Sequence, residues 1–519
     1  MRSYAVLAAA LCIAACGEPV GDRYELLIVN GSIYDGSGGE PRSAHIAVAG
    51  GRIVSVDADA NAAADVRIEA EGFAVVPGFI DPHTHALNDL KGTDTNTNLN
   101  YLTQGVTTVI VGSDGGGVPD FAATLQILRD QGMGTHAAFF VGHGEVREAV
   151  MGLENRAPTN DELESMQALV AEQMAAGALG LSTGLYYTPG SYAQTDEVVE
   201  LATVAAAFGG IYDSHMRDES SYSIGLLGSV EEVIEISERA GIPGHIAHLK
   251  ALGRDVWGQS GDVIALVEAA RGRGLEITAD QYPYRASGTR FRAALIPAWV
   301  RADSNEAMFA RIANPDLADG IRQEMEANLY RRGGAESLLV TGAGSLWQGQ
   351  TLAQIAEAME LDPIAAAVEV VRDGDPSIAS FNMNPNDIHA IAIQDWVMTG
   401  SDGSAGHPRK YASYPTVYRE MVVNAQWFST SRFVRRSSGL VADALRLCDR
   451  GYLREGLQAD IVVLDLDSYD AVADFQNPVA LSTGVVHAIV KGELAIRDRQ
   501  PTGVLAGDVV DRQQLDCEL

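Results

Sequence analysis

The octapeptide Gly78-Phe79-Ile80-Asp81-Pro82-His83-Thr84-His85 joins a short apolar run to a pair of histidines. The apolar residues on its N-terminal side predict a buried β-strand over residues 75–81. Side chains two apart in a strand point the same way, so His83 and His85 can present both imidazoles to one point beyond the strand. Neutral imidazole is the commonest transition-metal ligand. The pair therefore predicts a metal site, although an isolated H-x-H also fits a surface turn.

Length, charge and cysteine content limit the classes of protein. At 519 residues the chain is too long for one ordinary domain, but a (β/α)8 barrel with an appended domain fits. The formal net charge of −32 disfavours nucleic acid as a partner, because its phosphates would be repelled. A small anionic substrate is compatible with this net charge, because its binding depends on the local positive groups of a pocket. Beyond the first residues only Cys448 and Cys517 remain, which predicts no disulfide framework.

The N-terminus has the layout of an export signal. Met1-Arg2-Ser3 precedes an apolar run that ends at Ala15 and is too short to span a bilayer as a stable helix. Ile13-Ala14-Ala15-Cys16 resembles the bacterial lipoprotein box, and a plain signal peptide cleaved near Ala15 is the alternative. The resemblance implies a signal peptide over 1–16 and a lipid on Cys16, with Gly17 favouring the outer membrane. We therefore expect an exported protein on the periplasmic side, whose only membrane contact is the lipid anchor at Cys16.

The pattern of apolar runs predicts an α/β protein with a second, smaller β domain. Short β-type runs occur over 24–74 and 455–519, and neither segment has enough of them to form a useful sheet alone. We therefore predict one small β-sandwich domain built from both termini. Between them, strand-like and helical stretches alternate, as in a parallel sheet with crossover helices. Eight units without a G-x-G-x-x-G favour a closed (β/α)8 TIM barrel over 75–454. The predicted strands are 75–81, 106–112, 136–142, 177–184, 210–216, 244–250, 275–281 and 396–402.

The gap between the seventh and eighth predicted strands is far longer than one βα unit needs. It contains a helix start at Thr351 with capping-box spacing to Gln354, and a second at Asp362-Pro363, with Pro in the first turn. We predict an inserted subdomain over 291–390, near the mouth of the barrel, where it would act as a lid.

Polar side chains follow several of the predicted strands at the end where barrel enzymes place their sites. Each of these residues alone is more often structural, as a core histidine or a capping Asp. Together, four histidines and two carboxylates at one edge predict a metal centre. The residues are His83 and His85 after the first strand, Asp114 after the second, His215 at the fifth, His248 with Lys250 at the sixth, and Asp402 at the eighth.

An ordered series of motifs makes a family resemblance specific. The chain resembles the amidohydrolase superfamily and, within it, the D-aminoacylase (N-acyl-D-amino-acid deacylase) family, from about Tyr24 to Gly492. The motifs are the octapeptide at 78–85, Gln-Gly-Val-Thr-Thr-Val at 104–109, Leu-Ser-Thr-Gly-Leu-Tyr-Tyr-Thr-Pro-Gly at 181–190, Ser-His-Met-Arg at 214–217, Ile-Ala-His-Leu-Lys at 246–250, Asp-Gln-Tyr-Pro-Tyr at 280–284, Gly-Ser-Asp-Gly at 400–403 and His-Pro-Arg at 407–409. The resemblance implies a metal-dependent (β/α)8 barrel, in agreement with the pattern of strands.

The resemblance also implies roles for the metal ligands. His215 and His248 would hold a tightly bound Zn²⁺, and His83, His85 and Asp402 would line a second position, giving one or two ions per chain. The family commonly has a Cys ligand after the second strand, whereas this chain has Asp114, a harder donor that would bridge two metals.

The resemblance implies the reaction and the substrate. The metal would polarise an amide carbonyl and make a water acidic, and Asp402 would take the water proton and deliver it to the departing amine. Lys250, Arg409, Tyr187 and Tyr282 match positions that bind the substrate's α-carboxylate, so the expected partner is a small molecule with a free carboxylate. The family often has Ser at Gly288. His143 is expected either as a support of the site or as a core histidine.

Three functions fit the sequence. The leading one is a zinc hydrolase that removes the acyl group from N-acyl-D-amino acids. The alternative is a dipeptidase that cleaves L-Xaa-D-Xaa, or N-acyl dipeptide-like, substrates, which needs the same carboxylate site but a pocket that tolerates a free amine. A non-catalytic binding protein on the same scaffold is disfavoured because the histidines and Asp402 are all present.

Overall fold

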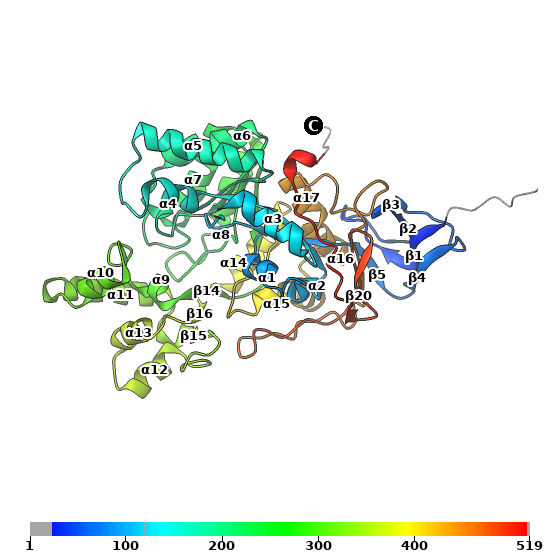
Figure 1. The fold of residues 1–519 in the computed structure, drawn as a ribbon. Helices are drawn as coiled ribbons and strands as arrows, with labels where there is room; N and C mark the ends of the chain where they lie inside the picture. The colour runs from blue at the N-terminus through cyan, green and yellow to red at the C-terminus, as the bar shows by residue number, and fades with distance from the viewer. Residues whose placement is uncertain (1–22, 119, 516–519) are drawn as a thin grey trace, which may run out of the picture.

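The computed structural model describes residues 23–118 and 120–515 (Figure 1). The predicted signal peptide, the lipoprotein box at Cys16 and Cys517 lie outside these residues. In the described part of the chain, no helix has the length and apolar character needed to cross a membrane. Cys448 is disulfide-bonded, so the expectation from the cysteine pattern was wrong.

The two ends of the chain pair in one sheet of nine strands. Its order is β21-β20-β19-β18-β5-β1-β2-β3, with β4 on β1, and the antiparallel pair β5–β18 joins the two ends. Strands from both termini therefore join in one hydrogen-bonded sheet. The strands are β1 (Tyr24–Ile33), β2 (Arg42–Ala49), β3 (Arg52–Ser55), β4 (Ala64–Glu69), β5 (Ala74–Pro77), β18 (Ile461–Leu464), β19 (Val485–Val490), β20 (Glu493–Arg497) and β21 (Gln500–Pro501).

The alternation of side chains along β1 explains why both faces of this sheet are covered. Leu26 and Ile28 point into one apolar cluster, whereas Leu27 and Val29 point into another. All four are buried, as expected for successive residues of a strand with apolar material on each side.

Parallel strands make up the central part of the chain. They pair as β6-β7-β8 and as β9-β10-β11-β12-β13-β17, and each predicted strand range contains at least one of them. A parallel bridge joins Thr84 to Gly403, beyond the ends of β6 and β17. The strands are β6 (Phe79–Asp81), β7 (Val106–Val111), β8 (His136–Phe139), β9 (Val141–Gly142), β10 (Gly180–Gly184), β11 (Ile211–His215), β12 (Gly244–Ile246), β13 (Ile277–Gln281) and β17 (Val397–Thr399).

The first predicted strand is divided at Gly78, which is a correction to the sequence analysis. Residues before it belong to β5 of the nine-stranded sheet, and residues after it form β6. A Cβ at Gly78 would lie 2.0 Å from the Oγ1 of Thr107, so only glycine allows the chain to pass β7 this closely.

Helices follow the parallel strands and pack against them through one large apolar cluster. Local signals set their ends: a capping box between Thr159 and Glu162 begins α5, and Gly241, with φ of 63°, ends α7. The helices are α1 (Leu87–Lys91), α2 (Leu99–Leu102), α3 (Phe121–Gln131), α4 (His143–Met151), α5 (Asn160–Ala175), α6 (Thr195–Ala207), α7 (Gly225–Ala240), α8 (Ser260–Gly272), α14 (Pro385–Ala392), α15 (Arg409–Thr416), α16 (Thr430–Ser437) and α17 (Gly439–Leu445), with the π-helix η3 (Val417–Asn424) and the 3-10 turns η1 (Gly190–Tyr192) and η4 (Arg512–Gln514).

A separate structural unit lies between β13 and β17. It has its own antiparallel sheet, β14-β16-β15, and its own apolar cluster, and Figure 1 shows it at the opposite side of the molecule from the nine-stranded sheet. The capping box at Thr351 and the Asp362-Pro363 helix start are both present. The elements are β14 (Ala286–Arg290), α9 (Phe291–Leu295), α10 (Asn305–Ile312), α11 (Pro315–Arg331), η2 (Ala335–Ser337), β15 (Leu338–Val340), α12 (Leu352–Met359), α13 (Pro363–Arg372) and β16 (Ser377–Phe381).

Candidate metal centre and active site

The side chains predicted at strand ends lie together at the carboxyl ends of the parallel strands. His83 and His85 follow β6, Asp114 follows β7, and His215 is the last residue of β11. The sixth and eighth strands end earlier than predicted, at Ile246 and Thr399, so that His248, Lys250 and Asp402 lie on the loops beyond them. Loops after parallel strands converge on one region, which places these distant residues side by side.

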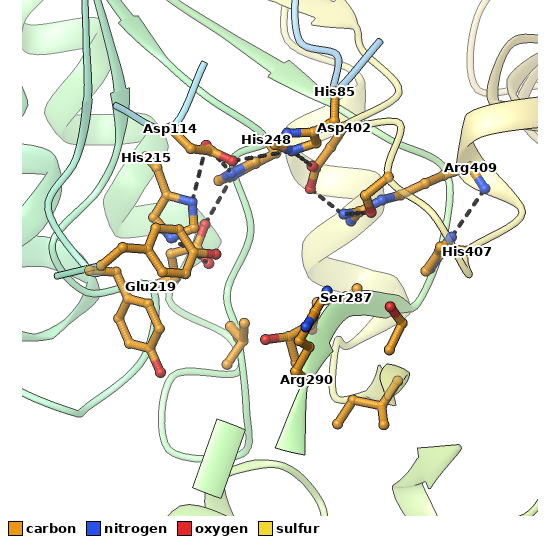
Figure 2. Close-up of a pocket in the computed structure, with 18 of the residues that line it drawn as sticks. His85, Asp114, His215, Glu219, His248, Ser287, Arg290, Asp402, His407 and Arg409 are labelled. Carbon is orange, nitrogen blue, oxygen red and sulfur yellow. Dashed lines mark hydrogen bonds and ion pairs between the residues drawn. The ribbon is translucent and has the colours of Figure 1, made fainter. Parts of the chain in front are cut away.

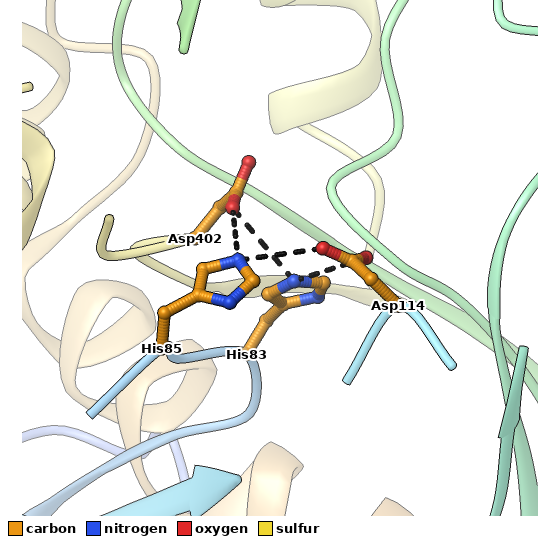
Figure 3. A group of neighbouring side chains, drawn as sticks. All are labelled: His83, His85, Asp114 and Asp402. Carbon is orange, nitrogen blue, oxygen red and sulfur yellow. Dashed lines mark ion pairs between the residues drawn. The ribbon is translucent and has the colours of Figure 1, made fainter. Parts of the chain in front are cut away.

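Asp114 lies at the centre of four imidazoles. Its Oδ1 is 3.3 Å from the Nε2 of His83, the Nδ1 of His215 and the Nε2 of His248. Its Oδ2 is 3.3 Å from the Nε2 of His85. These contacts are drawn in Figures 2 and 3. Burial opposes the charge of Asp114, but the surrounding histidines outweigh it and hold its pKa well below the usual range.

Asp402 completes the same group of side chains. Its Oδ1 is 3.3 Å from the Nε2 of His85 and 3.8 Å from that of His83 (Figure 3). Two sets of potential ligand atoms result, each within 4.8 Å of one another: His83, His85, Asp114 and Asp402 in one, and Asp114, His215 and His248 in the other. Asp114 belongs to both sets, the position that a bridging carboxylate requires.

The donor set fits a zinc ion. Both ring nitrogens of His83 and the Nδ1 of His215 are buried without a hydrogen bond in the described part of the chain. Buried polar atoms rarely lack a partner in native proteins, and a metal ion bound here would satisfy these nitrogens. Imidazole nitrogen and carboxylate oxygen are both ordinary Zn²⁺ ligands.

A layer of carboxylates beneath the ligands fixes their loops. Oδ2 of Asp280 accepts hydrogen bonds from the backbone N–H of His248 (3.0 Å) and pairs with the Nε2 of His245 at 3.0 Å. Oδ1 of Asp81 accepts from the backbone N–H of Ser401 at 3.0 Å. No role was predicted for either carboxylate, although an Asp in a buried strand is a signal for one.

Glu219 is a further member of the site that the sequence analysis missed. Its Oε1 is 3.1 Å from the Nδ1 of His248, and the same oxygen forms a close ion pair with the ammonium of Lys250. Its Oε2 is 4.0 Å from the Nε2 of His215. Burial would raise the pKa of Glu219, but Lys250 and the two histidines hold it below the usual range. The contact of Glu219 with the Nδ1 side of the ring holds His248 so that its Nε2 faces Asp114.

The cations predicted to bind substrate are already in contact with site residues. The Nζ of Lys250 contacts Glu219 and lies 2.9 Å from both the backbone oxygen and the Nδ1 of His248, so its donors are directed within the protein. The Nη1 of Arg409 lies 2.7 Å from the Oδ2 of Asp402, and its Nη2 donates to the Oγ of Ser404 at 2.8 Å (Figure 2). Burial raises the pKa of Asp402, but Arg409 and His248 lower it well below the usual range.

The two predicted tyrosines lie on different sides of the site. The ring of Tyr187 is 4.6 Å from that of His215. Tyr282 is buried, and the guanidinium of Arg409 lies 5.0 Å from its ring centroid. The Nε2 of the buried His143 is 3.0 Å from the Oε1 of Glu197. The structure therefore favours the second expectation for His143, a buried structural histidine.

These side chains open onto a cavity of about 400 Å³. One wall carries the candidate ligands His85, Asp114, His215, His248 and Asp402, together with Tyr187, Lys250 and Arg409. The segment between β13 and β17 supplies much of the remaining wall, including Ser287, Gly288, Arg290, Arg332, Ser377 and Ile378. A small molecule in this cavity would contact both parts of the chain.

Comparison with known proteins identifies the family. Residues 67–496 match the model of the amidohydrolase family. D-aminoacylase and N-acyl-D-glutamate deacylase of Alcaligenes xylosoxydans xylosoxydans are each 31% identical; the alignments cover 94% and 95% of this chain, and 98% and 97% of the relatives. A crystal structure of D-aminoacylase (28% identity, TM-score 0.81) and one of N-acyl-D-glutamate deacylase from Bordetella bronchiseptica, complexed with zinc and a phosphonate inhibitor (28%, TM-score 0.82), align with 94% of this chain and all of theirs. The chain therefore belongs to the amidohydrolase family.

Proposed function

We propose that the protein is a zinc-dependent amide hydrolase that removes the acyl group from N-acyl-D-amino acids. The observation that carries the proposal is Asp114, shared by two sets of metal-ligand atoms at the wall of a cavity that also holds Arg409. The relatives named D-aminoacylase and N-acyl-D-glutamate deacylase support it. The structure of N-acyl-D-glutamate deacylase from Bordetella bronchiseptica with zinc and a phosphonate inhibitor, a mimic of the tetrahedral intermediate, supports it as well.

The proposed ligands divide into two positions. Asp114, His215 and His248 would hold one zinc ion, and His83, His85, Asp402 and the other oxygen of Asp114 would hold a second. A structure of a D-aminoacylase is described as having a binuclear metal centre, which supports one or two ions per chain here. Bound zinc supplies a Lewis acid that polarises a carbonyl and makes a neighbouring water acidic.

Asp402 is the proposed general base and acid. One of its oxygens faces His85 and the other faces Arg409, so the carboxylate lies between the ligand cluster and the substrate cavity. The low pKa of Asp402 keeps it ionised at neutral pH, ready to accept the proton of the attacking water. It would return that proton to the amine, because an amine leaves an amide poorly unless it is protonated.

Arg409 is the proposed anchor for the α-carboxylate of the substrate. A guanidinium offers a planar pair of donors that matches a carboxylate. Gly288 gives the substrate room beside it, since a Cβ there would lie 3.0 Å from the Nη2 of Arg409. Tyr187 and Lys250 line the same cavity, and the guanidinium of Arg409 lies over the ring of Tyr282. We retain all three as proposed substrate-binding residues.

Metal analysis paired with a substrate screen tests the proposal. Signal-free protein would be assayed for zinc content and for hydrolysis of N-acetyl-D- and N-acetyl-L-amino acids and of L-Xaa-D-Xaa dipeptides, with Asp402→Asn as the control. Zinc near one or two per chain, D-selective hydrolysis of the N-acetyl compounds and an inactive control are expected. Turnover of dipeptides alone would replace this function with the dipeptidase alternative, and the absence of metal and of all turnover would leave a binding scaffold.

The division of the chain is proposed on the same basis as its function. The parallel strands would close into one (β/α)8 barrel within 75–454, supported by Phe140 as the single residue between β8 and β9 and by the Thr84–Gly403 bridge. Residues 24–74 and 455–519 would form the small β domain, and residues 291–390 most of the insertion. Limited proteolysis that released the insertion while the remainder stayed folded would support this division.

Export and lipidation remain proposals from the N-terminal sequence. We propose cleavage before Cys16, its lipidation and anchoring to the outer membrane from the periplasmic side. The disulfide at Cys448 supports an oxidising compartment, because disulfides rarely persist in the cytosol. Labelling of cells with a radioactive fatty acid should mark the native protein, and a Cys16→Ser variant should lose the label.

A further inference from the structure

The segment between β13 and β17 places one buried arginine in the cavity wall. Arg332 follows α11 and is 3% exposed. Its Nε donates to the hydroxyl of Tyr222 at 2.8 Å, and its Nη1 donates to the Oγ of Ser287 at 3.4 Å. The hydroxyl of Tyr186 is a further neighbour. All these partners are neutral, and in the described part of the chain Arg332 forms no ion pair.

A buried cation without a carboxylate is unusual in this cavity. The other buried cations of the wall are paired, Arg409 with Asp402 and Lys250 with Glu219. Removing a charge from water is unfavourable unless an opposite charge or a set of hydrogen bonds compensates it, and here hydroxyls alone do so. Arg290, at the end of β14, adds a second cation to the same wall and is likewise without an ion pair among the described residues (Figure 2).

Arg332 lies close to the proposed carboxylate anchor. Ser287, which accepts its hydrogen bond, is followed in β14 by Gly288, which packs against the guanidinium of Arg409. Successive Cα atoms are about 3.8 Å apart, so the two guanidiniums approach neighbouring residues of β14. Both guanidiniums also line the cavity. A substrate held at Arg409 would bring its other end, or its side chain, toward Arg332.

We propose that Arg332 forms a second anion-binding subsite and that the enzyme prefers N-acyl-D-amino acids that carry a second carboxylate. This inference rests on the proposed function. The guanidinium presents paired donors to a planar carboxylate, which would supply the missing counter-charge when substrate is bound. The second carboxylate can come from the side chain of the amino acid or from a dicarboxylic acyl group, and the two sources require separate substrates in the test.

Two substrate pairs measure the preference. N-acetyl-D-glutamate is compared with N-acetyl-D-glutamine, and N-succinyl-D-alanine with its neutral amide, N-succinamoyl-D-alanine. In one pair the wild-type kcat/KM should favour the anionic member by roughly 10- to 100-fold, the range for a hydrogen bond to a charged group. The favoured pair identifies the source of the carboxylate. Arg332→Met should bring that ratio close to one while leaving hydrolysis of the neutral member nearly unchanged.

Arg331→Met is the matched control. Its guanidinium lies 5.2 Å from the ring of Tyr222, but it donates to Ser221 and Asn328 and does not line the cavity. The control should keep the wild-type ratio. Arg332→Gln, which keeps a donor but removes the charge, replaces Arg332→Met if thermal unfolding shows that the latter is misfolded.

The outcomes separate the inference from the proposed function. Hydrolysis of the neutral substrates without preference in either pair would overturn the second subsite and leave the deacylase function intact. A preference that survives the loss of Arg332 would overturn the assignment to this residue. No hydrolysis of any N-acyl-D-amino acid would overturn the proposed function and, with it, the inference.

Discussion

Glu219→Gln should weaken zinc binding and destabilise the protein for two separable reasons. The side chain contacts the Nδ1 of His248 at 3.1 Å and forms an ion pair with Lys250, yet in the proposed site it holds no metal itself. The substitution keeps the size of the side chain and removes only its charge. It therefore tests whether Glu219 orients His248 or merely neutralises Lys250.

The structure sets the size of both effects. The side chains of Glu219 and Lys250 are 8% and 5% exposed, and removing one charge of a buried pair costs about 3–5 kcal/mol of folding free energy. Loss of the outer partner of a metal-binding histidine lowers metal affinity or activity by about 10- to 100-fold. The ammonium of Lys250 also lies near the Nδ1 of His248. Without the charge of Glu219 this ammonium would turn further toward His248 and add to the loss of metal affinity.

Three measurements distinguish the contributions. Competition with a chelating indicator gives the zinc affinity, and urea unfolding of the metal-free protein gives the stability. The kcat/KM of the zinc-loaded protein reports the effect on catalysis. Glu219→Gln combined with Lys250→Met removes both charges, so much of the stability should return while zinc affinity stays low. Wild-type zinc affinity in the single variant, or full recovery of it in the double variant, would refute the orienting role of Glu219.

Three further changes probe separate parts of the molecule. Asp402→Asn should lower kcat by about 10²- to 10⁴-fold in a protein that still binds zinc through His215 and His248, as measured by steady-state kinetics and metal analysis. Gly288→Ala should lower kcat/KM by roughly 10- to 100-fold, since its Cβ would lie 3.0 Å from the Nη2 of Arg409 and displace it, whereas unchanged kinetics would remove Arg409 from the substrate site. Asp460→Asn should destabilise the protein by about 2 kcal/mol at pH 7, because burial raises the pKa of Asp460 but His136 and Arg450 outweigh it and lower that pKa to about 2. The stability that ionised Asp460 contributes is present above its unfolded pKa near 4 and is lost as the pH falls toward 2. The urea midpoints of the wild type and the variant should therefore converge at low pH.

The strand ends were predictable because two local signals coincide there. A buried parallel strand is a short, mainly apolar run, and a histidine at its carboxyl end stands out, as His215 does at the last position of β11. The order of strands then places these residues at one edge without any knowledge of distances. The same reasoning placed Asp114, which the structure puts at 3.3 Å from all four histidines.

Residues away from the strand ends gave no comparable signal. Glu219 lies in the loop after β11, where an acidic side chain is ordinarily solvated, and only the return of that loop brings it to His248. Arg332 belongs to a unit with its own apolar cluster, and its place in the cavity depends on how that unit packs against the parallel strands. The division of the strand at Gly78 could not be predicted for a different reason. An uninterrupted apolar run has the pattern of one strand, and the close approach of Thr107 to Gly78 is a tertiary contact.

The backbone at the proposed ligands explains how strand ends can build a metal centre. Asp114, His248 and Asp402 have φ values of 58°, 36° and 48°, in the left-handed region that costs a non-glycine residue about 1–2 kcal/mol. Asp and His enter this region more readily than most residues, and here hydrogen bonds hold them in it. The N–H of Asp402 donates to the backbone oxygen of His83 (2.9 Å), and that of His248 donates to Asp280 (3.0 Å). A left-handed residue turns the chain sharply after a strand, so the ligand lies in the loop beyond the strand instead of continuing it. Asp280 thus stabilises the backbone conformation of His248, and Asp81 holds Ser401 beside Asp402. The geometry of the proposed centre therefore depends on these two carboxylates as well as on the histidines above them.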